Sequence, residues 1–107
     1  MSDEHPRLVF PEGFDDQWEW EIGQRGYFSE ARVESSDGSL YPVFFIDLTR
    51  LGQELQDAAI KLGQGWFAEP GLVVLQSITV PAMKEAARAL WGEGFFLRLR
   101  PLVQGDL

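Results

Sequence analysis

Four polar residues stand where the sequence passes from a predicted strand into a predicted helix. Asp47 and Thr49 lie at the first such junction, and Ser77 and Thr79 lie at the second. The carboxyl ends of strands in α/β sheets often hold ligands, and the free N–H groups of a helix N-terminus favour anions. These four residues form a candidate site for a small anionic ligand or a minor enzymatic reaction. The structural alternative is that the threonines cap helices and Asp47 pairs with an arginine.

The rest of the sequence offers little catalytic chemistry. Its one histidine, His5, lies in the N-terminal tail, and the chain has no cysteine. A Ser-His-Asp triad, thiolate chemistry and a His- or Cys-based metal site are therefore not expected. The segment from Gly63 to Ala68 fits the spacing G-x-G-x-x-A, but it follows a predicted helix instead of opening one, so it is predicted to end that helix. We expect no cofactor and no metal, and binding is favoured over catalysis.

Two helices must position the four polar residues. Thr49 is the predicted N-cap of a helix that runs to about Leu62, with Gly63 as the glycine that ends it. Thr79 is the predicted N-cap of a second helix, with Pro81 in its first turn and a stop at 92–94. The apolar face of that second helix is predicted to carry the following residues: Met83, Ala86, Ala87, Leu90 and Trp91.

The strands are read from residues that alternate with period two. Asp37-Gly38 predicts a two-residue hairpin turn that joins 27–35 to 40–48. Residues 18–22 alternate in the same way, so they are predicted to form a strand that precedes this hairpin, with Trp18 and Trp20 in the core. Short strands are also predicted at 72–77 and 95–100, and 7–10 is predicted as an edge strand.

The resulting order is β-β-β-α-β-α-β in one domain of 107 residues. We therefore predict an α/β (α+β) two-layer sandwich with a mixed sheet, an N-terminal antiparallel meander and two helices on one face. Residues 1–14 are predicted either to be frayed or to cover the outer face of the sheet.

The predicted hairpin register leaves one sheet face without helices. The aromatic and aliphatic side chains on this outward face are Phe28, Tyr41, Val43 and Phe45. Charged residues are predicted to surround them: Glu19, Glu21, Glu30, Arg32, Glu34, Arg98 and Arg100. Exposed apolar patches with charged rims are typical of interfaces, so these residues are the predicted interface; the alternative is that the N-terminal segment covers them.

The charge of the chain is unevenly distributed. Residues 1–49 contain 3 basic and 11 acidic residues, a net −8, whereas residues 50–107 contain 6 of each, a net 0. Such a field disfavours nucleic acid and favours either a basic protein surface or simple solubility. No apolar run is long enough to cross a membrane, and the polar start lacks the features of a signal peptide, so we expect a cytoplasmic protein.

Together these observations predict a non-catalytic, acidic protein-interaction module. Its partner would be either another protein, with a basic protein favoured, or a second copy of the chain bound through the outer sheet face. In one version the chain is an inhibitor or immunity-type protein that masks a basic cleft. The alternative is a protein that binds a small anionic ligand at the ends of the strands.

Overall fold

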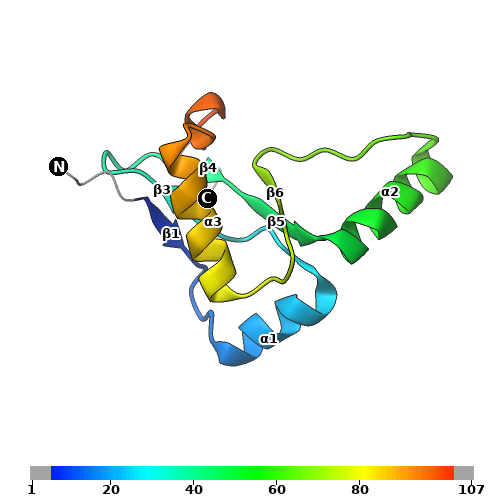
Figure 1. Ribbon diagram of the computed structural model, residues 1–107, viewed down its shortest axis with the longest axis horizontal. Helices are drawn as coiled ribbons and strands as arrows, with labels where there is room; N and C mark the ends of the chain where they lie inside the picture. Colours follow the sequence, from blue (N-terminus) through cyan, green and yellow to red (C-terminus); the bar gives the residue numbers. More distant parts are fainter. Residues whose placement is uncertain (1–5, 103–107) are drawn as a thin grey trace.

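The computed structural model describes residues 6–102, which form six strands, three α-helices and one 3-10 helix (Figure 1). Their order is β1 (Arg7–Val9), α1 (Asp16–Arg25), β2 (Tyr27–Phe28), β3 (Arg32–Glu34), β4 (Leu40–Pro42), β5 (Phe44–Asp47), α2 (Leu48–Leu62), β6 (Leu72–Leu75), α3 (Val80–Gly92) and η1 (Phe96–Arg98). The α+β class and the layering of helices on strands are confirmed. His5 lies outside the described residues. No helix within 6–102 is both long and apolar enough to cross a membrane.

The strands form two three-stranded sheets, where a single one was predicted. The first has the order β1-β3-β4 and is antiparallel, with the predicted edge strand β1 confirmed at its margin. The second has the order β2-β5-β6, in which β5 pairs antiparallel with β2 and parallel with β6. The β5-α2-β6 crossover is thus the predicted strand–helix–strand unit. Its two strands carry both junctions that hold the four polar residues.

The core lies where both sheets meet α1 and α3. Its largest fully buried side chains are Phe28, Phe45, Phe96, Ile22, Ile46, Met83 and Val33. Phe10 and Phe14 reach it from the N-terminal segment, and their rings lie 6.2 and 5.5 Å from that of Phe28. The N-terminal segment therefore packs against Phe28, which was predicted to lie on the outward face of the sheet.

Residues 16–25 form a helix, so the strand predicted at 18–22 is wrong. Asp15 caps this helix by accepting a hydrogen bond from the backbone N–H of Trp18 at 2.9 Å, and Gly26 ends it with a φ of 83°. Residues four apart share a face of a helix. Trp18 and Ile22 therefore both face the core, whereas Trp20 is 65% exposed on the other side. The sequence of residues 18–22 fits the period of a strand and that of a helix, and the Asp15 cap and the terminal Gly26 are consistent with the helix.

The hairpin exists, but its register differs from the predicted one. The connection is a three-residue loop, 36–38, in which Ser35 and Ser39 pair and Gly38 has a φ of 87°. Val33 consequently lies opposite Tyr41 instead of Pro42. A shift of one residue turns a strand over. For this reason Tyr41, predicted to face outward, is buried beside Val33.

Both later helices begin and end close to the predicted positions. Gly63 ends α2 with a φ of 64°, which confirms that the glycine-rich segment stops a helix. Thr79 caps α3, and Met83 and Ala87 on its predicted face are buried. The cap of α2 is Asp47, not Thr49: its carboxylate accepts a hydrogen bond from the N–H of Arg50 at 2.8 Å. The strand predicted at 95–100 is also wrong, because the chain turns at Gly94 into η1.

Candidate functional site

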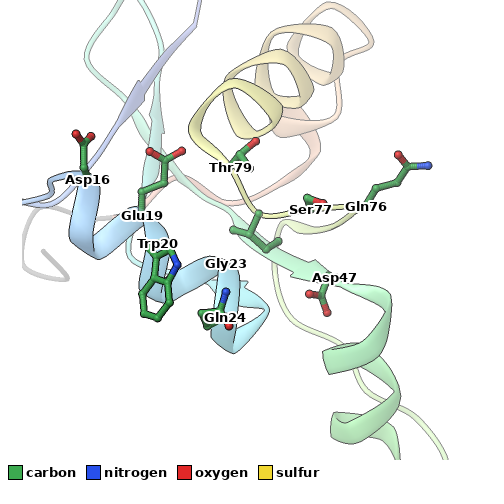
Figure 2. A pocket seen from close by; sticks show the side chains of 10 residues that line it. Asp16, Glu19, Trp20, Gly23, Gln24, Asp47, Gln76, Ser77 and Thr79 are labelled. Carbon is green, nitrogen blue, oxygen red and sulfur yellow. The ribbon is translucent and has the colours of Figure 1, made fainter.

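The candidate site is a pocket of about 410 Å³ between α1, the start of α2 and the segment that joins β6 to α3. Its lining residues are Asp16, Glu19, Trp20, Gly23, Gln24, Asp47, Gln76, Ser77, Ile78 and Thr79. Figure 2 places Glu19 and Trp20 on α1, with Ser77 and Thr79 across from them and Asp47 at the start of α2. A pocket of this size is within the range of small-ligand sites.

Three of the four predicted ligand-site residues meet at this pocket. Asp47, Ser77 and Thr79 line it, and Thr49, the second residue of α2, does not. The parallel pairing of β5 with β6 explains the meeting, because Asp47 lies opposite Leu75 at the ends of the two strands. The strand–helix pattern was therefore sufficient to locate one wall of the site.

The other wall is α1, whose contribution the sequence reading missed. Asp16, Trp20, Gly23 and Gln24 reach the pocket because residues 16–25 are helical. A strand would have directed Trp20 into the core. The available signals for the helix were Asp15, a favoured cap residue, and Gly26 eleven positions later.

Glycine at position 26 allows two elements of the pocket to approach closely. A Cβ at Gly26 would lie 2.9 Å from both carboxylate oxygens of Asp47, and the N–H of Asp47 donates to the carbonyl oxygen of Gly26 at 2.8 Å. A Cβ at Gly23 would lie 3.6 Å from the carbonyl oxygen of Ile78, an ordinary contact. Thus α1 is held against both the start of α2 and the segment before α3.

The helix N-termini at this site already have carboxylate partners. Glu19 Oε2 accepts a hydrogen bond from the N–H of Val80 at 2.7 Å, at the start of α3. Asp47 Oδ1 accepts a hydrogen bond from the backbone N–H of Arg50, at the start of α2. The predicted attraction of two helix termini for an anion is therefore largely satisfied by the protein's own side chains.

The electrostatics of the pocket are negative. Asp16, Glu19 and Asp47 contribute carboxylates, and none of the described lining residues is basic. The guanidinium groups of Arg25 and Arg50 instead lie over the ring of Tyr27, 4.6 and 4.7 Å from its centroid. Within residues 6–102 no group of three or more side chains could hold a metal ion. The arrangement suits an organic cation, which three separated acceptors and an exposed indole can contact.

The site shows no hydroxyl paired with a base in the described part of the chain. Thr79 Oγ1 accepts the capping hydrogen bond from the N–H of Ala82 at 3.3 Å. No hydrogen bond within residues 6–102 joins Ser77 or Thr79 to a carboxylate, which a nucleophile activated by a base requires.

The predicted interface does not form as a single surface. Phe28, Tyr41, Val43 and Phe45 are all buried, because the real register turns them toward the core. Their predicted charged neighbours are dispersed. Glu19 lines the pocket, and Glu21 is exposed on the same helix.

The remaining members of the predicted rim have other partners or locations. Glu30 pairs with Arg25 at 3.4 Å, and Glu34 pairs with Arg7 at 3.1 Å. Arg32 donates to the carbonyl oxygens of Ser29 and Ala31. Arg98 lies in η1 and Arg100 follows it, so neither belongs to a sheet.

Comparison of the chain with protein-family models, with curated proteins and with solved structures finds no match.

Proposed function

We propose that the protein is a non-catalytic interaction module that binds a basic protein by accepting a cationic side chain in the acidic pocket. The observation that carries the proposal is the composition of the pocket: three carboxylates, a Trp20 side chain that is 65% exposed, and no basic group among the described lining residues. A lysine or arginine entering the pocket would gain carboxylate acceptors together with the face of an indole ring.

The charge of the whole chain supports this choice of partner. The net charge is −8, and the excess of acids lies in residues 1–49, which supply α1 and Asp47 to the pocket. Such a field accelerates encounter with a basic surface and makes association sensitive to salt. An inhibitor or immunity-type protein that masks a basic cleft is the specific form of the proposal.

The test is to titrate the protein with a short arginine-rich peptide and to monitor the titration by NMR. We expect the indole signal of Trp20 and the amide signals of Gln24, Ser77 and Thr79 to shift. A glutamate-rich peptide of equal length should cause no shift. Trp20→Ala should weaken binding about 5-fold, since a cation–π contact at an exposed site contributes about 1 kcal/mol.

The matched control is Trp66→Ala. Trp66 is 63% exposed, almost the same as Trp20, but it lines a different pocket beside α2. Its removal should leave peptide binding unchanged. The proposal is wrong if the peptide shifts no pocket signal, or if the two tryptophan variants lose affinity equally.

A second candidate function is supported by the meeting of Asp47, Ser77 and Thr79 at one cavity. The protein would then bind a small molecule there, and the surrounding carboxylates favour a cationic or neutral ligand over the anion predicted from sequence. Melting temperatures measured with a panel of amines and carboxylic acids distinguish the candidates, since a ligand of the native state raises the melting temperature. Silence across the panel would exclude the tested ligands and leave the protein partner favoured.

A further inference from the structure

The helix α2 carries an apolar stripe that no other part of residues 6–102 covers. Three of its four leucines, Leu48, Leu55 and Leu62, recur every seven residues and are 73%, 40% and 71% exposed. Gly52 and Ala59 lie between them on the same side and are also exposed. We name these five residues the leucine stripe. Apolar residues on a surface helix normally face a core, so an exposed stripe of this length indicates a missing partner.

The position of α2 shows why the rest of the described chain does not cover the stripe. The helix packs mainly against β5, and its buried residue is Ala58, about a quarter turn round the helix from the stripe. Figure 1 shows α2 projecting from the body, away from α1 and α3. The four charged residues of α2 all lie on the far side from the stripe: Arg50, Glu54, Asp57 and Lys61.

We propose that the leucine stripe is the contact surface of a homodimer in which α2 packs antiparallel against α2 of a second copy. The leucines of the stripe are spaced evenly about Leu55, with Leu48 seven residues before it and Leu62 seven residues after it. A twofold axis at Leu55 would set each Leu55 against its mate and Leu48 against Leu62. Self-complementarity of this kind is what a twofold interface requires.

The small residues and the charges both favour this arrangement. Gly52 and Ala59 allow two helices to approach closely, and Thr49 and Gln56, which flank the stripe, carry no charge that could repel its mate. A parallel pair would bring the two acidic bodies together, each with a net charge of −8. Figure 1 shows the body of one chain joined to the start of α2, so an antiparallel pair would place the two bodies at opposite ends of the helices.

The exposed area of the stripe sets the expected affinity of the homodimer. The three leucines expose on the order of 300 Å² of apolar side chain per copy, and interfaces below about 1,200 Å² in total are typical of weak, reversible association. The dimer is therefore expected to form in the micromolar to millimolar range. This inference does not depend on the acidic pocket, because none of the residues that line the pocket belongs to the stripe.

The first experiment is sedimentation equilibrium from about 10 µM to about 1 mM, the range in which an interface of this size dissociates. The mass should rise from 12.1 kDa toward twice that value. Leu55→Glu places two carboxylates together at the axis and should weaken the dimer at least 10-fold. Ile60→Glu is the matched control, because Ile60 is 73% exposed on the same helix but lies outside the stripe.

Cross-linking fixes the orientation. The chain has no cysteine, so Leu55→Cys introduces a single thiol that should form a disulfide with its symmetry mate under mild oxidation. Leu48→Cys alone should not cross-link, whereas a mixture of Leu48→Cys and Leu62→Cys should. Far-ultraviolet circular dichroism checks that each variant is folded.

The salt dependence of association distinguishes the homodimer from the proposed binding of a basic protein. Screening should strengthen a dimer of two acidic chains and weaken binding of a basic partner. A monomer at every concentration overturns the dimer, as does a dimer that survives Leu55→Glu or is lost equally with Ile60→Glu. Cross-linking by Leu48→Cys alone overturns the antiparallel orientation.

Discussion

Glu19 on α1 and Val80 at the start of α3 are joined by a 2.7 Å hydrogen bond, although 61 positions separate them in the sequence. The carboxylate satisfies an N–H group that the helix itself leaves free, and its charge lies at the positive end of the helix dipole. One contact therefore ties two sides of the pocket together and completes the cap that Thr79 begins.

Removing the Glu19 carboxylate should therefore destabilise the fold. We expect Glu19→Ala to lower the free energy of unfolding by about 1–2 kcal/mol, the usual value of a helix cap, and Glu19→Gln to lower it less because an acceptor remains. Urea denaturation measures both. Glu21→Ala is the control, since Glu21 is exposed on the same helix and should change stability by less than about 0.5 kcal/mol. Equal losses at the two positions would contradict the capping role.

Gly26 should not tolerate alanine. Its φ of 83° costs an L-residue about 1–2 kcal/mol, and the added Cβ would lie 2.9 Å from both carboxylate oxygens of Asp47. Gly13→Ala separates the two effects, because Gly13 has a φ of 87° with nothing within 4 Å of the added atom. Thermal unfolding should show a larger loss for Gly26→Ala. If both variants lose the same stability, the close approach of Asp47 has no energetic weight.

Much of the fold could be predicted where one period dominates the pattern. The face of α3 that carries Met83 and Ala87, its cap Thr79 and the terminal Gly63 of α2 each follow from local rules that the structure obeys. The meeting of Asp47 with Ser77 and Thr79 also follows, because a strand–helix–strand unit places strand ends side by side.

The errors arose where two local readings were both allowed. Residues 18–22 alternate as a strand would, yet Trp18 and Ile22 are also four apart, and tertiary packing on Phe14 and Phe28 selects the helix. The hairpin turn had a two-residue and a three-residue solution, and that difference of one residue decides which side chains are buried. The acidic pocket could not be foreseen because its second wall depends on the first of these choices.

Phe45 tests the corrected register directly. It is fully buried and pairs with Phe28, whereas the predicted register placed it on the surface. We expect Phe45→Ala to cost about 3–5 kcal/mol, a large part of the 5–15 kcal/mol that stabilises a typical domain. Leu97→Ala, a truncation of an exposed side chain in η1, should cost little. Chemical denaturation distinguishes them, and a Phe45→Ala variant as stable as Leu97→Ala would restore the predicted outward face.

The hairpin loop should show one perturbed carboxyl group. Two hydrogen bonds to the Asp37 carboxylate hold its pKa below the ordinary value of 3.8. The larger effect comes from the Ser35 hydroxyl, and the next from the backbone N–H of Ser39, which donates at 2.9 Å. NMR titration of the Asp37 carboxyl carbon should give a midpoint below 3.8, and Ser35→Ala should raise that midpoint toward 3.8 because it removes the largest cause. Ser36→Ala, in the same loop, should leave it unchanged.

The same shift fixes the sign of the stability change with pH. Because the pKa of Asp37 is lower in the folded state than in the unfolded chain, its carboxylate stabilises the fold above the unfolded value and loses this effect as the pH falls through the folded value. The difference in unfolding free energy between the natural chain and Asp37→Asn should therefore be constant above about pH 5 and shrink below 3.8. A difference that grows on acidification, or a titration midpoint above 3.8, would show that the loop does not stabilise the charged form.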